Sequence, residues 1–183
     1  MFNPLTLNAK IYDTGLAGPR VLVLGAVHGN ETCGPIAIQK FMDEMAAGQH
    51  KLLNGRVTFI PIVNEKAHAM NVRFVDENLN RNMVPHTHPQ NYEQSLMPDL
   101  CGYLADCDVL LDIHSASETT PPYAFVNATK HPHEMDYAQH LGVTFAVTGW
   151  EDAYQKLETS AAQSSGGTTE YARTFGATAL TIE

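Results

Sequence analysis

A histidine and a glutamate, His28 and Glu31, stand three residues apart directly after the apolar stretch VLVLGAV at residues 21–27. Imidazole nitrogens and carboxylate oxygens are both zinc ligands, and Gly29 permits a tight turn that would let the two side chains converge. An isolated pair of this kind has a simpler explanation: an ordinary loop histidine, and a glutamate that only favours a helix dipole. Residues elsewhere in the chain must therefore decide.

A second histidine, His114, directly follows the apolar stretch 108–113. With His28 and Glu31 it would form a His, Glu, His set, which leaves a fourth position for water, as catalytic zinc sites do. Asp112, two residues before His114, could orient an imidazole as an outer partner. Taken alone, His114 is more simply interpreted as a core histidine at the end of a strand.

Charged and amide side chains gather between Arg73 and Arg81, which are two of only five arginines in the chain. A guanidinium can bind a carboxylate through two parallel hydrogen bonds and can stabilise a developing oxyanion. The alternative is a solvated loop in which Arg81 pairs with Asp76 or Glu77, an interaction that would contribute little.

The last residue of the sequence, Glu183, comes immediately after the apolar stretch 178–182. A carboxylate at the tip of a buried strand suits a general base acting on water activated by zinc. The alternative is an ordinary terminal glutamate without a role.

Short apolar stretches recur along the chain, and these must form the elements that position the candidate residues. They are rich in Val, Ile, Leu and Thr and nearly continuous, as is typical of strands covered on both faces. They comprise residues 21–26, 56–62, 108–113, 123–127, 143–148 and 178–182. Helical patterns lie between several of them. The alternation predicts an α/β sandwich with a mainly parallel or mixed sheet, and a site at the carboxyl ends of the strands.

The first helical pattern covers residues 31–48. Asn30 is its expected N-cap, and Ile36, Phe41 and Met45 are expected on its buried stripe. Further helices are expected over about 92–105 and after His133 and Thr168.

Composition excludes several classes of protein. The 183 residues are 44% hydrophobic and 17% charged, which is ordinary for a single globular domain. A net charge of −9 gives no basic surface for nucleic acid or an anionic membrane, so neither partner is expected. The three cysteines lack CxxC spacing and favour a reducing compartment. Without a signal-peptide pattern or an apolar stretch near ~20 residues, a soluble, cytoplasmic protein is expected.

Four short motifs occur in a fixed order: HGNE at 28–31, NLNR at 78–81, DIHS at 112–115 and TIE at 181–183. Together they resemble the succinylglutamate desuccinylase/aspartoacylase family, relatives of the zinc carboxypeptidases, over nearly the whole chain. The resemblance implies a three-layer α/β sandwich with a mixed, mainly parallel sheet, as in zinc carboxypeptidases. It also reverses the simpler interpretation of each separate motif.

The resemblance further implies one zinc ion per chain, bound by His28, Glu31 and His114. Glu183 would be the catalytic base that deprotonates the metal-bound water and later gives the proton to the leaving amine. Arg73 would be a catalytic residue that polarises the scissile carbonyl.

By the same resemblance, Asn80 and Arg81 would hold a carboxylate of the substrate. Arg173, ten residues before Glu183, matches a further substrate-carboxylate arginine of the aspartoacylase branch. One position departs from the family: Asn78 stands where the motif DLNR has Asp, which weakens any role that needs a charge there.

Family members continue past the catalytic glutamate into a smaller β-rich domain that helps to wall the substrate site. Residues 1–183 are therefore expected to be a zinc-dependent deacylase catalytic domain, truncated at the catalytic glutamate and without that C-terminal β domain. Because no residue follows Glu183, its backbone is expected to fray, so that the chain holds zinc but turns over poorly.

The leading functional hypothesis is zinc-dependent hydrolysis of the amide bond of an N-acyl amino acid. The substrate would be a small molecule that carries a carboxylate, similar to succinylglutamate or acetylaspartate. A carboxypeptidase-type zinc peptidase acting on small peptides would use the same centre. The alternative from another class is a non-catalytic, zinc-bound binding module, against which the intact Glu183 favours an enzyme.

Overall fold

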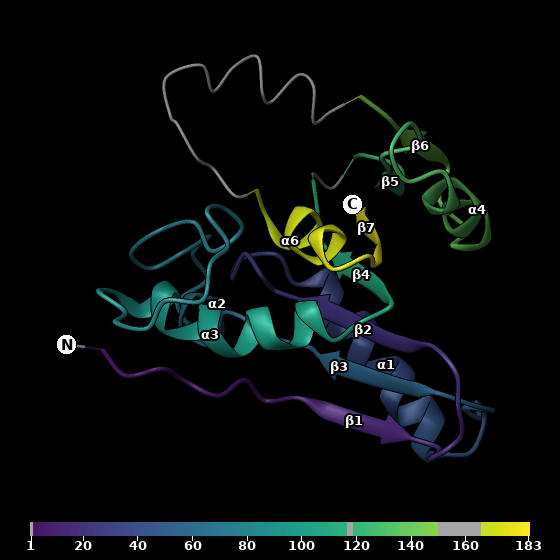
Figure 1. Cartoon of the computed structure of the whole chain (residues 1–183), viewed down its shortest axis with the longest axis horizontal. Coiled ribbons are helices and arrows are strands. Elements are labelled where there is room, and N and C mark those ends of the chain that lie inside the picture. Colours follow the sequence, from purple (N-terminus) through teal and green to yellow (C-terminus); the bar gives the residue numbers. More distant parts are fainter. Residues whose placement is uncertain (1, 117–118, 150–165) are drawn as a thin grey trace.

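The computed structural model describes residues 2–116, 119–149 and 166–183, and within them one sheet of seven strands crosses the molecule (Figure 1). In chain order the strands are β1 (Lys10–Asp13), β2 (Arg20–Gly25), β3 (Arg56–Ile60), β4 (Val109–Ile113), β5 (Tyr123–Phe125), β6 (Phe145–Val147) and β7 (Thr178–Ile182). Across the sheet their order is β1-β3-β2-β4-β7-β5-β6.

Parallel pairing dominates the centre of the sheet. β2 pairs in parallel with β3 and with β4, and β4 pairs in parallel with β7. β1 joins β3 antiparallel, β5 joins β7 antiparallel, and β6 runs parallel to β5. The predicted mixed, mainly parallel sheet is confirmed. β1 has no counterpart among the predicted strands because its sequence KIYD, largely exposed at the sheet edge, lacks the apolar run used to find the others.

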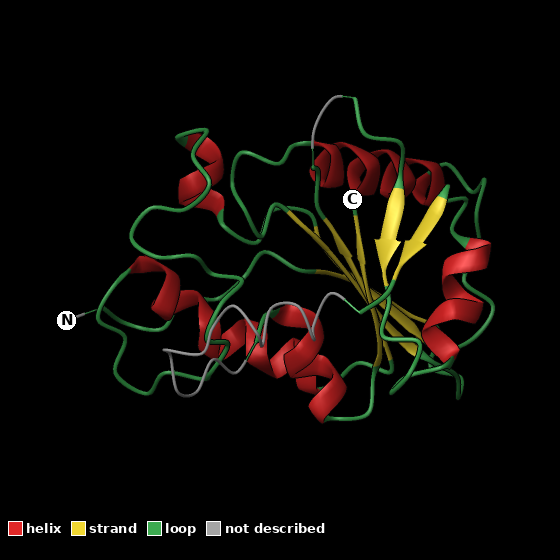
Figure 2. Cartoon of the chain, turned by 90° about the horizontal axis from the view of Figure 1, so that it is seen from above, coloured by secondary structure: helices red, strands yellow, loops and turns green. Residues whose placement is uncertain are grey.

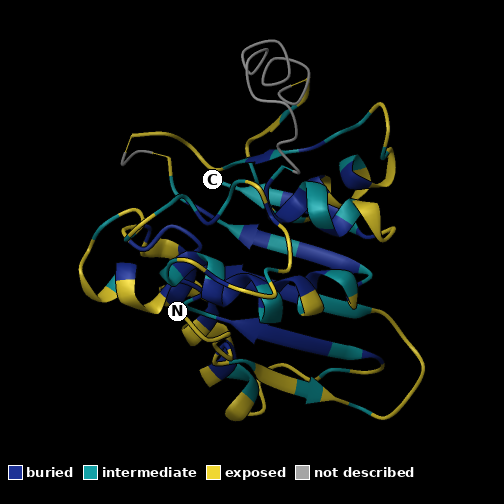
Figure 3. Ribbon diagram, turned by 60° about the vertical axis from the view of Figure 1, so that its left-hand side comes forward, coloured by how far each residue is buried: buried dark blue, intermediate teal, exposed yellow. Residues whose placement is uncertain are grey.

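Helices cover both faces of the sheet, which gives three layers (Figure 2). On one face, Leu22 and Leu110 lie in an apolar cluster with residues of α3 (Tyr92–Ala105) and α6 (Thr168–Thr174). Figure 3 shows the central strands largely buried between the layers. The three-layer α/β sandwich implied by the motifs is therefore confirmed.

On the opposite face, Val23 packs with α1 (Cys33–Ala46), and Leu180 packs with α4 (His133–His140). A fifth helix, α2 (Glu65–Ala69), is short and follows β3. None of the helices in the described part of the chain is long and apolar enough to cross a membrane.

The start of α1 differs from its prediction. Thr32 is the N-cap, so Asn30 is not, and Glu31 precedes the helix. The Glu31 amide donates to the carbonyl of His28 at 3.1 Å, and this turn occupies the residues that would otherwise begin the helix.

The buried stripe of α1 also differs from its prediction. Ile36 and Phe41 are 67% and 41% exposed, whereas Ile38 and Met42 are buried. The helix faces the sheet through Gly34, where an added Cβ would lie only 3.0 Å from the Cα of Gly25 in β2. That close approach fixes which side of the helix is buried. By contrast, the prediction for residues 92–105 is confirmed by α3.

Candidate metal centre

The candidate residues meet at one edge of the sheet because they follow neighbouring parallel strands. His28 and Glu31 follow β2, and His114 follows β4, whose Ile113 is in register with Gly25. Glu183 follows β7, whose Ile182 is in register with Ile113. This is the carboxyl edge, where parallel sheets place their ligands.

A tight turn brings His28 and Glu31 to the same side of the chain. Gly29 in this turn packs directly on α2, where an added Cβ would come within 2.3 Å of the backbone carbon of Ala67. Its amide donates to the carbonyl of Arg73 at 3.0 Å, which ties the turn to the Arg73–Arg81 loop. A side chain at this position would therefore force the turn or α2 to shift.

The three predicted ligands form one buried cluster. Nδ1 of His28 lies 2.9 Å from Oε1 of Glu31, and Nδ1 of His114 lies 2.8 Å from Oε2. The two Nδ1 atoms are 3.1 Å apart, and the three residues are 3%, 6% and 2% exposed in chain order. Ligands of a tetrahedral zinc ion are about 3.3 Å apart, so this donor set fits such an ion after a slight expansion. The structure therefore brings together all three residues that the sequence predicts as ligands.

The outer nitrogens of both histidines face side-chain oxygens. Nε2 of His28 is 3.1 Å from Oδ1 of Asn78, and Nε2 of His114 is 3.0 Å from Oδ2 of the fully buried Asp112. The contact between His114 and Asp112 is short enough for an ion pair, but its geometry is not that of a hydrogen bond. The hydroxyl of Thr168 donates to the same Asp112 oxygen. Outer partners of this type fix the ring orientation of metal-binding histidines.

The electrostatics of the cluster favour positive charge at its centre. Burial raises the pKa of Glu31, but hydrogen bonds from His114 and His28 outweigh it and hold that pKa well below its ordinary range. Burial lowers the pKa of His114, but the negative charges of Asp112 and Glu31 and the hydrogen bond to Glu31 outweigh it and raise the pKa to about 10. A proton or a metal cation is therefore stabilised here.

Arg73 reaches the cluster from the neighbouring loop. Its Nη1 donates to Oε1 of Glu31 at 2.9 Å, while 47% of its side chain stays exposed. A guanidinium that is half exposed beside a candidate metal ligand can turn toward a molecule bound at the site.

Asn80 and Arg81 lie in the same loop as Arg73, and part of Asn80 is already engaged. Its Oδ1 accepts from the backbone amide of Thr168 at 2.9 Å, and its backbone amide donates to Oδ1 of Asn78 at 3.0 Å. Nη1 of Arg81 donates to the carbonyl of Asn80 at 2.6 Å. Asn80 thus holds the start of α6, a structural role that sequence reasoning missed.

Glu183 is held more firmly than predicted. Its amide donates to the carbonyl of Tyr123 at 2.8 Å, and the Tyr123 amide donates back at 3.0 Å, so the expectation of a fraying backbone is wrong. Oε2 of Glu183 is buried without a hydrogen-bond partner in the described part of the chain. Burial raises the pKa of this carboxyl above its ordinary value, an effect that His114 opposes and Glu31 reinforces.

Arg173 is engaged in a structural ion pair. Its Nε and Nη2 donate to the two oxygens of the fully buried Glu134 at 2.7 and 2.9 Å, and Nη2 also donates to the carbonyl of Ala179. Only 8% of the side chain is exposed. These contacts favour a structural role for Arg173, the joining of α6, α4 and β7, while the substrate-binding role expected from the resemblance stays a prediction.

Two residues with roles around the centre, Thr168 and Glu93, were not singled out from the sequence. Thr168 contacts Asp112 across 56 positions, and Glu93 binds the loop backbone at Val75 across 18 positions. Both contacts depend on how the helices pack, so no local pattern signals them.

A family model described as the succinylglutamate desuccinylase/aspartoacylase catalytic domain matches residues 17–183 of this chain. No curated protein sequence matches this chain. The chain is similar in structure to a succinylglutamate desuccinylase/aspartoacylase from Rhodobacter sphaeroides, with a TM-score of 0.74 and 22% identity over 99% of the chain. That alignment covers 55% of the Rhodobacter protein.

Two further solved structures share the fold. The ectoine utilization protein EutE from Ruegeria pomeroyi, solved with product bound, has a TM-score of 0.69 and 21% identity, covering 99% of this chain and 57% of its own. The tripeptide-bound cell shape determinant Csd4 from Helicobacter pylori has a TM-score of 0.69 and 15% identity. That alignment covers 96% of this chain and 49% of Csd4. The chain thus spans about half the length of these proteins.

Proposed function

Because the chain belongs to the succinylglutamate desuccinylase/aspartoacylase catalytic-domain family, we propose that it hydrolyses the amide bond of an N-acyl amino acid with zinc held by His28, Glu31 and His114. One observation carries the proposal. Two imidazole nitrogens and a carboxylate converge within 3.1 Å at the carboxyl edge of the sheet, in a buried site that Glu183 borders. Zinc bound there would polarise the scissile carbonyl and make water acidic enough to attack it at neutral pH.

The chain's own groups supply the proton transfers and the charge stabilisation. Glu183 accepts the proton of the attacking water and then delivers it to the leaving amine. Its raised pKa, caused first by burial, suits a group that must hold a proton between the two transfers. Arg73 turns from Glu31 toward the carbonyl oxygen and stabilises the charge that develops on it.

The substrate carboxylate is assigned to Arg81 and to the amide nitrogen of Asn80. The side-chain oxygen of Asn80 accepts from the Thr168 amide, so the side-chain Nδ2 is the group of Asn80 that would donate to a carboxylate. A small carboxylate-bearing molecule is the expected partner. The acyl group and the amino acid depend on the shape of the complete substrate pocket.

The first test is metal content combined with a substrate panel. Elemental analysis of the purified chain should find one zinc per chain. His114→Ala should lose most of it, and the matched variant His88→Ala, at an exposed loop histidine, should keep it. Stoichiometric zinc in His114→Ala would overturn the ligand assignment.

The panel should contain N-acyl amino acids and small peptides at equal zinc occupancy. Turnover of the acyl amino acids, with a loss in Glu183→Gln of roughly 10²-fold or more in kcat at unchanged zinc, would support the deacylase mechanism. Turnover of peptides alone would favour a zinc peptidase, a candidate kept because the tripeptide-bound Csd4 shares this fold. Stoichiometric zinc with binding but no turnover would leave a binding module.

A further inference from the structure

Glu93, in the first turn of α3, is fully buried, yet the mechanism above does not use it. Its Oε1 accepts from the amide of Val75 at 2.7 Å and from Nδ2 of Asn64 at 3.1 Å. Its Oε2 accepts from the amides of Asp76 and Glu77 at 3.0 and 3.3 Å. A buried carboxylate is tolerated only when such donors replace water, so the carboxylate and the backbone at 75–77 require each other.

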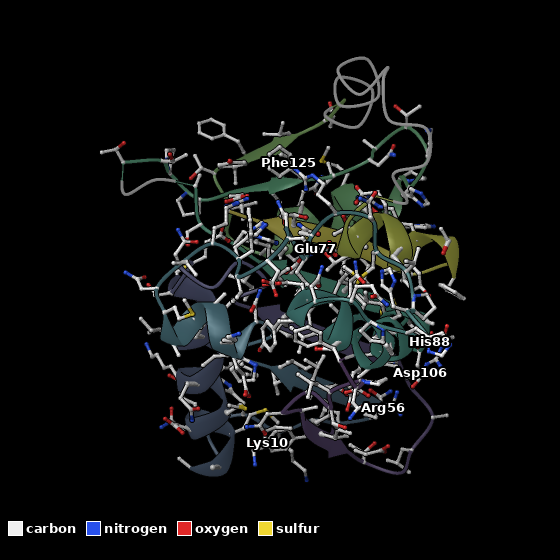
Figure 4. The ribbon with its side chains drawn as sticks, turned by 90° about the vertical axis from the view of Figure 1, so that its left-hand side faces the viewer. Lys10, Arg56, Glu77, His88, Asp106 and Phe125 are labelled. Atoms are coloured by element: carbon white, nitrogen blue, oxygen red, sulfur yellow. The ribbon has the colours of Figure 1, made fainter. Side chains whose placement is uncertain are left out.

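The same loop residues bind back to the start of α3. Oδ2 of Asp76 accepts from the amide of Tyr92 at 3.0 Å, and Oε2 of Glu77 accepts from Nε2 of Gln94 at 3.3 Å. We call these reciprocal contacts between residues 75–77 and 92–94 the loop clamp. Figure 4 marks the loop by the side chain of Glu77.

The loop clamp lies between the two loop residues that contact the candidate metal ligands. Arg73, two residues before it, donates to Glu31, and Asn78, directly after it, faces Nε2 of His28. Shifting the backbone at 75–77 would move both contacts together. A single buried carboxylate thus binds the backbone between two separate contacts to the cluster.

Asn64 extends this connection to the strand that carries the ligands. Its amide donates to the carbonyl of Ala26, just after β2, at 3.0 Å, and its side chain donates to Glu93. Glu93 is thereby connected to the residues on either side of Gly29: through Asn64 to Ala26, and through the loop and Arg73 to Glu31.

We infer that Glu93 is a positioning residue of the metal centre, whose carboxylate holds residues 73–78 so that Arg73 and Asn78 reach Glu31 and His28. The inference rests on the proposed function only in taking the His28, Glu31 and His114 cluster as the zinc site. Outer partners of metal-binding histidines typically change metal affinity roughly 10- to 100-fold when lost. Loss of the loop clamp should act on zinc affinity in the same range.

The central experiment compares two buried glutamates. Glu93→Gln keeps the shape but turns one acceptor into a donor that faces backbone amides. Glu134→Gln is the matched control, because Glu134 is equally buried and also accepts several N–H donors, but its partners are Arg173 and the backbone of Asn127 rather than the 73–78 loop. Zinc affinity is measured for the folded proteins by competition with a chromophoric chelator, and thermal unfolding is recorded in parallel.

The inference expects both variants to lose stability but only Glu93→Gln to lose zinc affinity, by roughly tenfold or more. Amide hydrogen exchange at residues 75–77 should also accelerate in Glu93→Gln alone. If Glu93→Gln fails to fold, Asp76→Ala is used instead, because it removes the exposed contact of the loop clamp with the Tyr92 amide. This variant should also weaken zinc binding, by a smaller factor.

The outcomes separate this inference from the proposed function. Wild-type zinc affinity in a folded Glu93→Gln, or in Asp76→Ala where Glu93→Gln does not fold, overturns the inference and leaves the zinc site standing. Absence of zinc binding by the wild-type chain overturns the proposed function. It also removes the metal centre that Glu93 is inferred to position, so the inference falls with it.

Discussion

The two candidate histidine ligands differ in the side chain that holds the outer nitrogen. His28 faces the neutral amide of Asn78, whereas His114 faces the buried carboxylate of Asp112. The negative charge of Asp112 favours the doubly protonated imidazole of His114 in the metal-free protein. His114, with a pKa raised to about 10, stays protonated at neutral pH. This protonation contributes stability that is fully present below pH 6.5, the ordinary value, and is lost as the pH rises through 10.

This difference predicts a proton released on metal binding. At pH 8, between the ordinary and the raised pKa of His114, zinc must displace the imidazole proton, so about one proton should leave per zinc bound. Calorimetry in two buffers of different protonation enthalpy measures that number. Asp112→Asn should lower the pKa of His114 and reduce the release, and equal release from both proteins would contradict the prediction.

The two loop arginines should separate in kinetics. Arg81, assigned to the substrate carboxylate, binds in the ground state and the transition state alike, so Arg81→Lys should raise KM more than it lowers kcat. Arg73 acts on developing charge, so Arg73→Lys should mainly lower kcat. Steady-state kinetics on the best N-acyl amino acid measure kcat and KM of both variants. Wild-type values of kcat and KM in both would contradict the two assigned roles.

At the scale of elements, the site depends on one turn pressed against one helix. In the turn 28–31, Gly29 packs so closely on the backbone of α2 that no side chain fits between them. This packing lets the turn present His28 and Glu31 together. Glu31 lies in this turn and outside α1, which begins at Cys33. The turn and α2 therefore act as one unit in positioning the ligands.

Adding a methyl group tests this unit. Gly29→Ala would bring a Cβ within 2.3 Å of Ala67, so we expect a loss of about 1–3 kcal/mol in the free energy of unfolding and weakened zinc binding. Gly102→Ala in α3 is the control, because its Cβ would meet nothing within 4 Å and alanine is favoured in a helix by about 1 kcal/mol. Urea unfolding and zinc titration of both variants give the comparison. Equal behaviour of the two variants would show that the close packing is unimportant.

At the scale of the whole molecule, distant segments are joined by a buried ion pair. Glu134 of α4 and Arg173 of α6 form two hydrogen bonds at 2.7 and 2.9 Å, and Arg173 also binds the backbone of β7. Removing one partner of a buried pair leaves the other charge without compensation, which is far more costly than losing an exposed pair. β7 ends at Ile182, directly before Glu183, so this pair supports the strand that carries the proposed base.

Arg173→Ala should therefore act on stability rather than on substrate binding. We expect the free energy of unfolding to fall by about 3–5 kcal/mol, while KM of the folded protein stays near the wild-type value. Urea unfolding and steady-state kinetics at low temperature distinguish the two effects. A large rise in KM with unchanged stability would restore the substrate role that the motif resemblance implied.

The sequence by itself determined the class of fold and indicated the candidate residues of the metal cluster. Nearly continuous apolar stretches identified β2, β3, β4 and β7, and the polar residues directly after them marked the carboxyl edge. This works because parallel strands buried on both faces need apolar side chains throughout, and a polar residue stands out where such a strand ends. His28, Glu31 and His114 became candidates in this way, and the resemblance of the four ordered motifs to the family then favoured them over the simpler interpretations.

Only the tertiary structure decided how the polar side chains pair around that cluster. Arg173 binds Glu134, Asn80 binds Thr168, and Glu93 binds the loop at 75–77, all across long stretches of sequence. A buried polar group must find a partner, but which partner it finds depends on the layers that bring helices and loops together. The side chains of Arg173 and Asn80 carry the same donors and acceptors in either role, so their chemistry is visible in the sequence while their pairing is set by packing.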